Sequence, residues 1–221
     1  MVAANLEKAR FNMVQQQIRP WEVVDQRVID TLEVLPRDAF VPEEYKNLAY
    51  TDTEIPISSD QQMMAPKIEA RLLQALNIKE SDKVLEIGTG SGFLTACLSK
   101  LAASVISFEI DETLYEQASK RLSEQNIKNV DLRNDDGLQQ PSIQGAPFDV
   151  IAITGSLPVL DDYLKQLQKV GGRMFVVTGD ADPMEANLVT RISKDAWRTE
   201  ALFETELAPL KNAPQREKFT F

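Results

Sequence analysis

Hydrophobic residues along this chain follow two rhythms, one helical and one typical of buried strands. In the first third, apolar residues recur at helical spacing over residues 5–18, 25–35 and 67–77. The clearest of the three is 25–35, which Asp25 can cap at its start and Pro36 ends. The proline-rich stretch between the second and third helices shows little periodicity, so we predict a long irregular segment there, of the kind that often serves function.

From residue 83 onward, short apolar runs alternate with amphipathic segments. The predicted strands are 83–87, 104–110, 130–133, 148–154 and 173–178, and the predicted helices are 93–101, 113–125 and 160–168. This alternation predicts βαβ units and a doubly wound, mainly parallel sheet. Two further strands, 189–193 and 197–207, are predicted to close the sheet in antiparallel fashion. We therefore expect an N-terminal helical extension over 1–78 and an α/β domain over 79–221.

Charge and composition narrow the classes of function. The 221 residues include 24 Lys and Arg against 34 Asp and Glu, a net charge of −10, which repels nucleic-acid backbones and anionic membrane surfaces. There is no histidine and one cysteine, Cys97, so Ser-His-Asp and Cys-His catalysis are excluded and no metal site is expected. The chain shows no signal-peptide pattern and no apolar run long enough to cross a membrane, so we expect a cytoplasmic protein.

The strongest chemical signal is the run VLEIGTGSG, in which an acidic residue near the end of an apolar strand precedes three glycines. Bare glycine backbone lets a ligand approach where a Cβ would collide, at the strand ends where open α/β sheets bind ligands. A dinucleotide fingerprint needs a third glycine where Phe93 stands, which argues against an NAD-linked oxidoreductase, and a P-loop would need Gly-Lys-Ser/Thr. Glu86 would oppose a pyrophosphate but suits a ligand with an ammonium and a sulfonium, S-adenosylmethionine.

Two further strand ends add acidic groups to the same predicted pocket. Glu109 ends the next strand and is placed to accept hydrogen bonds from ribose hydroxyls, and Asp135-Asp136-Gly137 at the end of the strand after it offers a side-chain oxygen to accept from an adenine amino group. Tight packing of the glycine turn, a solvated acid at Glu109 and a turn role for Asp136 remain alternatives. The candidate cofactor-binding residues are Glu86, Gly88, Thr89, Gly90, Gly92, Glu109, Ile110, Asp136 and Gly137.

The chain resembles the protein-L-isoaspartate (D-aspartate) O-methyltransferase family from about residue 10 to 210. The likeness is in MVQQQIRP and DQRVIDTLEVLPRDAFVPEEYKNLAYTDTEIPI, in KVLEIGTGSGFLTACLS, and in FDVIAITGSLP and VGGRMFVVTGD. It implies a class I S-adenosylmethionine-dependent methyltransferase (Rossmann-like) fold, a seven-stranded mainly parallel sheet with helices on both faces, its last one or two strands antiparallel. It also implies a substrate-side loop in the N-terminal extension, S-adenosylmethionine as donor and a protein isoaspartyl carboxylate as acceptor.

One segment departs from the family pattern. The family's G-x-G-Q-T-I-S is replaced here by SSDQQMM, so Met64 stands at the position of the active-site serine. A thioether cannot donate a hydrogen bond to a substrate carboxylate. An acceptor other than isoaspartate, or a non-catalytic relative that binds cofactor or partner, is therefore an alternative. A carboxylate acceptor is already ionised at pH 7 and needs no general base. No catalytic residue, oligomeric state or role for the tail 208–221 is predicted.

Overall fold

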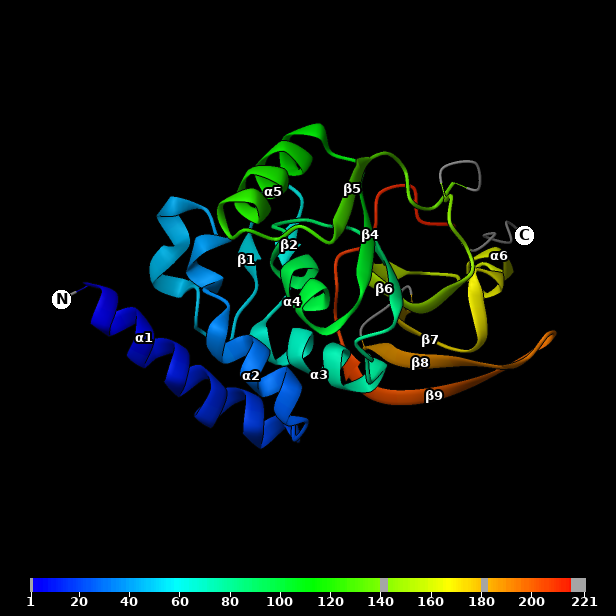
Figure 1. The fold of residues 1–221 in the computed structure, drawn as a ribbon, viewed down its shortest axis with the longest axis horizontal. Helices are drawn as coiled ribbons and strands as arrows, with labels where there is room; N and C mark the ends of the chain where they lie inside the picture. Colours follow the sequence, from blue (N-terminus) through cyan, green and yellow to red (C-terminus); the bar gives the residue numbers. More distant parts are fainter. Residues whose placement is uncertain (1, 140–142, 180–182, 216–221) are drawn as a thin grey trace, which may run out of the picture.

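The protein is described by a computed structural model covering residues 2–139, 143–179 and 183–215 (Figure 1). The end of the predicted tail, 216–221, lies outside these residues. The N-terminal helices lie at one end of the molecule and the long strands β8 and β9 lie along one border of it (Figure 1).

A seven-stranded sheet in the order β5-β4-β3-β6-β7-β8-β9 is the centre of the fold. Neighbouring strands from β5 to β7 are parallel, whereas β8 is antiparallel to both β7 and β9. The strands are β3 (Lys83–Ile87), β4 (Ser104–Glu109), β5 (Val130–Asn134), β6 (Phe148–Leu157), β7 (Gln168–Thr178), β8 (Met184–Ser193) and β9 (Ala196–Thr205). The predicted fold class, a mainly parallel sheet closed by antiparallel strands, is confirmed.

Alternating residues of the central strands enter two separate cores. Val84 and Val105 belong to the core on one face, together with residues of α3 (Pro66–Leu76) and α4 (Phe93–Leu101). Leu85 and Ile106 belong to the core on the other face, which includes Leu164 of the short helix α6 (Asp162–Gln166). Because both faces are covered, β3 and β4 are buried at nearly every position. Helix α5 (Glu112–Glu124) packs against β4 and β5.

Three predicted boundaries were too short. Strand β6 runs to Leu157 instead of residue 154, β7 begins at Gln168 instead of 173, and β8 begins at Met184 instead of 189. In β7 the pair Gly171-Gly172 indicates a turn, yet the structure keeps it inside the strand, with Gly171 at a φ of +82°. The register with β6 jumps from Phe148↔Gln168 to Val150↔Arg173, so the two glycines lie in an irregularity of β7 where glycine is typical.

The N-terminal extension comprises α1 (Val2–Met13), a π-helical turn (Val14–Ile18), α2 (Gln26–Val34), short 3-10 segments and a two-stranded hairpin. The predicted N-cap of α2 is confirmed, since the carboxylate of Asp25 accepts a hydrogen bond from the amide of Arg27. The hairpin, β1 (Ile55–Pro56) and β2 (Gln62–Met63), lies within the segment predicted to be irregular.

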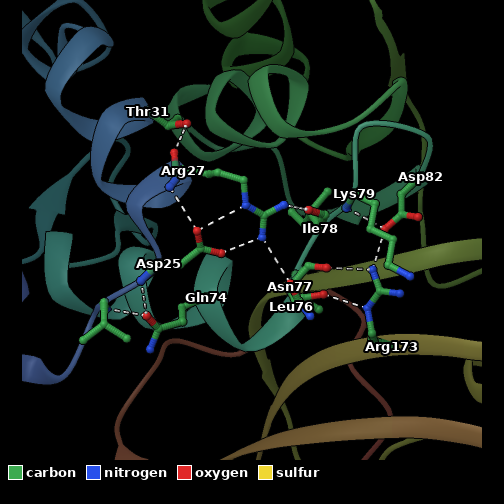
Figure 2. A network of polar contacts seen from close by, with 11 residues as sticks. Asp25, Arg27, Thr31, Gln74, Leu76, Asn77, Ile78, Lys79, Asp82 and Arg173 are labelled. Carbon is green, nitrogen blue, oxygen red and sulfur yellow. Dashed lines mark hydrogen bonds and ion pairs between the residues drawn. The ribbon is translucent and has the colours of Figure 1, made fainter.

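A polar network joins this extension to the sheet (Figure 2). Arg27 of α2 donates to the Ile78 carbonyl oxygen at 2.7 Å, and Arg173 of β7 donates to the Leu76 carbonyl oxygen at 2.7 Å and forms an ion pair with Asp82. The carbonyl groups at the end of α3 are thus satisfied by two cations from opposite sides. The boundary predicted at 78/79 passes through this network and stays a prediction.

Candidate active site

A cleft opens at the carboxyl ends of β3, β4 and β6. It encloses about 780 Å³, including space open to solvent. The glycine loop after β3, the segments after β4 and β5, and Thr154 and Gly155 near the end of β6 line it. The loop around Ile57–Met64 and the segment Leu207–Lys211 form the other walls. Strand ends and two distant chain segments therefore meet at one site, as expected for an open α/β sheet.

The glycine loop presents bare backbone to the cleft because little else fits. Gly88 has a φ of +98°, and a Cβ there would lie 2.3 Å from the Oγ1 of Thr154. The hydroxyl of Thr154 donates to the Ile87 carbonyl oxygen at 2.9 Å, while the Gly88 amide donates to the Phe108 carbonyl oxygen at 2.9 Å. The turn is thus fastened to β6 and β4, and Gly88 and Gly90 line the cleft.

Glu109, at the end of β4, brings a nearly buried carboxylate to the cleft. Its two oxygens accept hydrogen bonds from the amides of Gly90, at 2.8 Å, and Asp111, at 3.0 Å. Burial raises the pKa of Glu109, while these two amides act against that shift. Each oxygen retains a lone pair for a further donor, so this carboxylate can bind a diol. Ile110 follows it and also lines the cleft.

The third predicted site follows β5. Gly137 lies so close to the sheet that a Cβ would be 2.9 Å from both the Ile87 Cγ2 and the Phe108 Cβ, which explains the glycine by space alone. Asp136 lines the cleft, and its carboxylate accepts hydrogen bonds from the Leu138 amide and from the side chain of Asn212, both at 2.9 Å. The structure therefore brings Gly88, Gly90, Glu109, Ile110, Asp136 and Gly137 together around one cleft.

Glu86 and Gly92 are not among the residues that line it. The side chain of Glu86 is fully buried beneath the loop, where its Oε2 accepts from Thr95 at 2.5 Å and Ser107 at 2.6 Å. Burial raises the pKa of Glu86 to about 8. Ser107 shares a 2.6 Å hydrogen bond with Thr89, which lines a smaller hollow beside the cleft. Glu86 thus reaches the loop through hydroxyl groups.

Gly92 serves the packing of two helices. A Cβ there would lie 3.3 Å from the Cβ of Ala118 in α5, and its φ of +87° precedes the first residue of α4. This close approach of α4 and α5 explains why a glycine stands at position 92.

Met64 lines the cleft at the position that the resemblance assigns to serine. Its carbonyl oxygen accepts a 2.6 Å hydrogen bond from Arg37, and the same guanidinium pairs with Glu69 at 2.7 Å. Both charged side chains are buried, and burial raises the pKa of Glu69 to about 7 despite its cationic partner. This ion pair fixes the backbone of the loop from beneath.

Sequence analysis missed several cleft residues. Thr154 could have been predicted, because it is a polar residue at the end of an apolar strand. Leu210 and Lys211 belong to the tail, whose sequence pattern does not indicate where it packs. Backbone hydrogen bonds from the amide of Ser156 to Ala208 and from the amide of Leu210 to Ser156 place this tail segment along the end of β6. Only tertiary structure shows that pairing.

In the part of the chain that the structure describes, no helix is both long and apolar enough to span a lipid bilayer.

Comparison with known proteins agrees with this geometry. Residues 8–214 match the model of the family described as protein-L-isoaspartate(D-aspartate) O-methyltransferase (PCMT). A protein-L-isoaspartate O-methyltransferase of Rhodopseudomonas palustris is 36% identical over 203 residues, which cover 91% of this chain and 92% of the relative. One of Methanospirillum hungatei is 37% identical over 201 residues, covering 91% and 92%.

Solved structures match the fold. A Plasmodium falciparum protein-L-isoaspartate O-methyltransferase structure in complex with S-adenosyl-L-homocysteine has a TM-score of 0.78 at 19% identity, covering 93% of this chain and 97% of that one. A second structure, named protein-L-isoaspartate O-methyltransferase, has a TM-score of 0.76 at 22% identity and covers 92% of this chain and 65% of its own. By the family model and the sequence relatives, this chain belongs to the protein-L-isoaspartate (D-aspartate) O-methyltransferase family.

Proposed function

We propose that this protein is an S-adenosylmethionine-dependent O-methyltransferase that methylates the carboxylate of isoaspartyl residues in proteins or peptides. The observation that supports it most is the meeting of a glycine loop, the Glu109 carboxylate and the Asp136 carboxylate at three successive strand ends. The names of the sequence relatives support the same reaction.

The cleft fits a sulfonium nucleoside. Gly88 and Gly90 line the cleft without side chains, and Glu109 presents a nearly buried carboxylate to it, placed for ribose hydroxyl groups. Asp136 is placed for an adenine amino group, beside Gly137 and Ile110. Thr89 shapes the loop through Ser107. When bound, the cofactor would supply an electrophilic methyl group, and a carboxylate oxygen of the acceptor would form the new C–O bond as the C–S bond breaks and S-adenosylhomocysteine leaves.

The chain's own residues contribute position and exclusion of water. Ile57, Met64 and Leu210 give the cleft apolar walls around the glycine loop. The acceptor carboxylate is ionised at neutral pH, with a reference pKa of about 4, so no residue has to remove a proton. A site without histidine is sufficient for this chemistry, because alignment of the two reactants supplies the rate.

Catalytic activity, substrate class and location are proposed as the sequence predicts them. Neither the described part of the chain nor the relatives favour the non-catalytic alternative. A protein or peptide carboxylate is the proposed substrate, and the cytoplasm is the proposed location.

The test uses S-adenosylmethionine labelled in its methyl group and two peptides that differ only in an isoaspartyl or a normal aspartyl residue. Base-labile label on the isoaspartyl peptide alone is the expected result. Calorimetry with S-adenosylhomocysteine measures the cofactor site separately. Cofactor binding with no label on the peptide would refute isoaspartate as the acceptor, and no binding at millimolar concentration would refute the cofactor as well.

A further inference from the structure

The cleft has an unusual balance of charge for an enzyme whose acceptor is an anion. Four carboxylates line it, those of Glu54, Glu109, Asp135 and Asp136. Within the described ranges, Lys211 is the one Lys or Arg side chain that lines it. Like charges in a partly desolvated cleft repel an incoming carboxylate, so an anionic acceptor needs a cation there.

The other side chains that line the cleft offer an acceptor carboxylate little else. Met64 has no donor, and the hydroxyl of Thr154 is already donated to backbone carbonyl oxygens of the glycine loop. Gln61 and Gln62 line the cleft with neutral amides. Charge-assisted hydrogen bonds are roughly twice as strong as neutral ones, so an ammonium group is the best available partner for a carboxylate.

Lys211 is carried on a backbone that the fold fixes in place. The adjacent Leu210 donates its amide to Ser156 at 3.1 Å, and its side chain lies where Cβ atoms on Gly88 or Gly155 would collide with it. On the other side, Asn212 donates to Asp136 at 2.9 Å. The root of the lysine is therefore rigid, and its flexible stem can direct the ammonium group into the cleft.

The present partners of Lys211 are exchangeable. Its Nζ lies 3.2 Å from Asp111 and 3.7 Å from Asp60, and the Asp60 side chain is 57% exposed. The hydrogen bond with Asp111 raises the pKa of Lys211, which keeps the group charged. Solvent-exposed ion pairs of this kind contribute little to stability, so an arriving carboxylate can replace Asp60 at small cost.

We propose that Lys211 is the specificity-determining residue that receives the acceptor carboxylate at the mouth of the cleft. This proposal rests on the proposed function. The ammonium group binds one carboxylate oxygen and leaves the other free to face the glycine loop. Asp60 and Asp111 hold the lysine ready when no acceptor is bound.

Binding of peptides to the protein saturated with S-adenosylhomocysteine, measured by calorimetry, tests the proposal without turnover. Lys211→Met should weaken binding of the isoaspartyl peptide by about 10-fold or more, because a hydrogen bond to a charged group is lost. The methyl ester of the same peptide should bind wild type and variant alike, and Lys211→Arg should retain most of the affinity. The affinity for S-adenosylhomocysteine should change by less than about 2-fold.

Two further variants test whether Lys211 binds the acceptor or only holds the tail in place through its ion pairs with Asp60 and Asp111. Asp111→Asn keeps the cap of α5, since asparagine caps as well as aspartate, and Asp60→Asn removes the other competing charge. If Lys211 receives the acceptor, these variants bind the isoaspartyl peptide as tightly as wild type or more tightly. A loss of peptide affinity like that of Lys211→Met would show that these ion pairs have a structural role, and would overturn the proposal.

Two other results would also overturn it. An unchanged peptide affinity in Lys211→Met refutes the role of the lysine while leaving the methyltransferase activity standing. A loss confined to S-adenosylhomocysteine would instead assign the lysine to the cofactor. Failure of wild-type protein to label the isoaspartyl peptide would refute the proposed function itself, and this proposal with it.

Discussion

Glu86 makes the stability of this protein depend on pH, and Glu86→Gln should remove that dependence. Its carboxyl group is fully buried, and its Oε1 has no hydrogen-bond partner among the described residues. Glutamine keeps an oxygen to accept from Thr95 and Ser107, with an amide in place of that unpartnered atom. The substitution therefore deletes the ionisable group and preserves most of its shape.

The magnitude follows from the two pKa values. Burial raises the pKa of Glu86 from 4.5 to about 8, so below pH 4.5 the group is protonated in both folded and unfolded protein. Between these values only the unfolded chain ionises, and the free energy of unfolding falls by about 1.4 kcal/mol per pH unit. Glu86 thus lowers the free energy of unfolding by up to about 5 kcal/mol as the pH rises to 8. This value is an upper bound, because buried sites relax.

Urea unfolding of wild type and Glu86→Gln at pH 5 and pH 8.5 measures this difference. At pH 5 we expect the two proteins to agree within about 2 kcal/mol, the cost of a buried unpaired amide. At pH 8.5 the variant should gain about 2–5 kcal/mol relative to that comparison. Glu124→Gln on the exposed face of α5 controls for the substitution itself. A difference that stays the same at both pH values would refute the assignment of a protonated, buried Glu86.

Three other predictions address the cleft and its support. Glu109→Ala should weaken the binding of S-adenosylhomocysteine by about 1–3 kcal/mol, measured by calorimetry. Unchanged affinity would refute the assignment of Glu109 to the ribose. Gly171→Ala, with positive φ but open space, should lower the free energy of unfolding only by backbone strain, about 1–3 kcal/mol. Gly88→Ala should cost more than that, because of the collision with Thr154, and should abolish cofactor binding; equal losses would refute the collision. Arg37→Met should cost about 3–5 kcal/mol in urea unfolding at pH 8 by leaving Glu69 unpaired, and less at pH 5, where Glu69 takes up a proton; a pH-independent loss would contradict this.

The fold was predictable because the pattern of apolar residues follows from burial. Central strands covered on both faces carry short apolar runs, and the helices between them show one apolar stripe, so both were found with errors at their ends. One error lies at an irregularity in a strand, in β7, where the register shifts around Gly171 and the strand continues beyond it. The hairpin β1–β2 escaped prediction because each strand is two residues long.

The site was predictable only where strand ends carry it. Glu109 and Asp136 follow β4 and β5, so their meeting follows from a parallel sheet. Leu210 and Lys211 come from a tail whose place is fixed by hydrogen bonds to Ser156, a contact across more than fifty residues that no local pattern encodes. Spacing also cannot tell which way a side chain turns at a strand's end, and Glu86 turns away from the cleft.

The glycine loop is held from two sides, which divides its neighbours by role. Beneath it, Glu86 contacts Ser107, and Ser107 contacts Thr89, so a buried carboxyl group fixes the turn through hydroxyl groups. Above it, Thr154 and Leu210 close the space that any side chain at Gly88 would need. A loop so confined binds its ligand with backbone already in place, which reduces the ordering that binding would otherwise require. Glu86 and Ser107 thus support the loop without lining the cleft, whereas Thr154 and Leu210 both confine the loop and line the cleft.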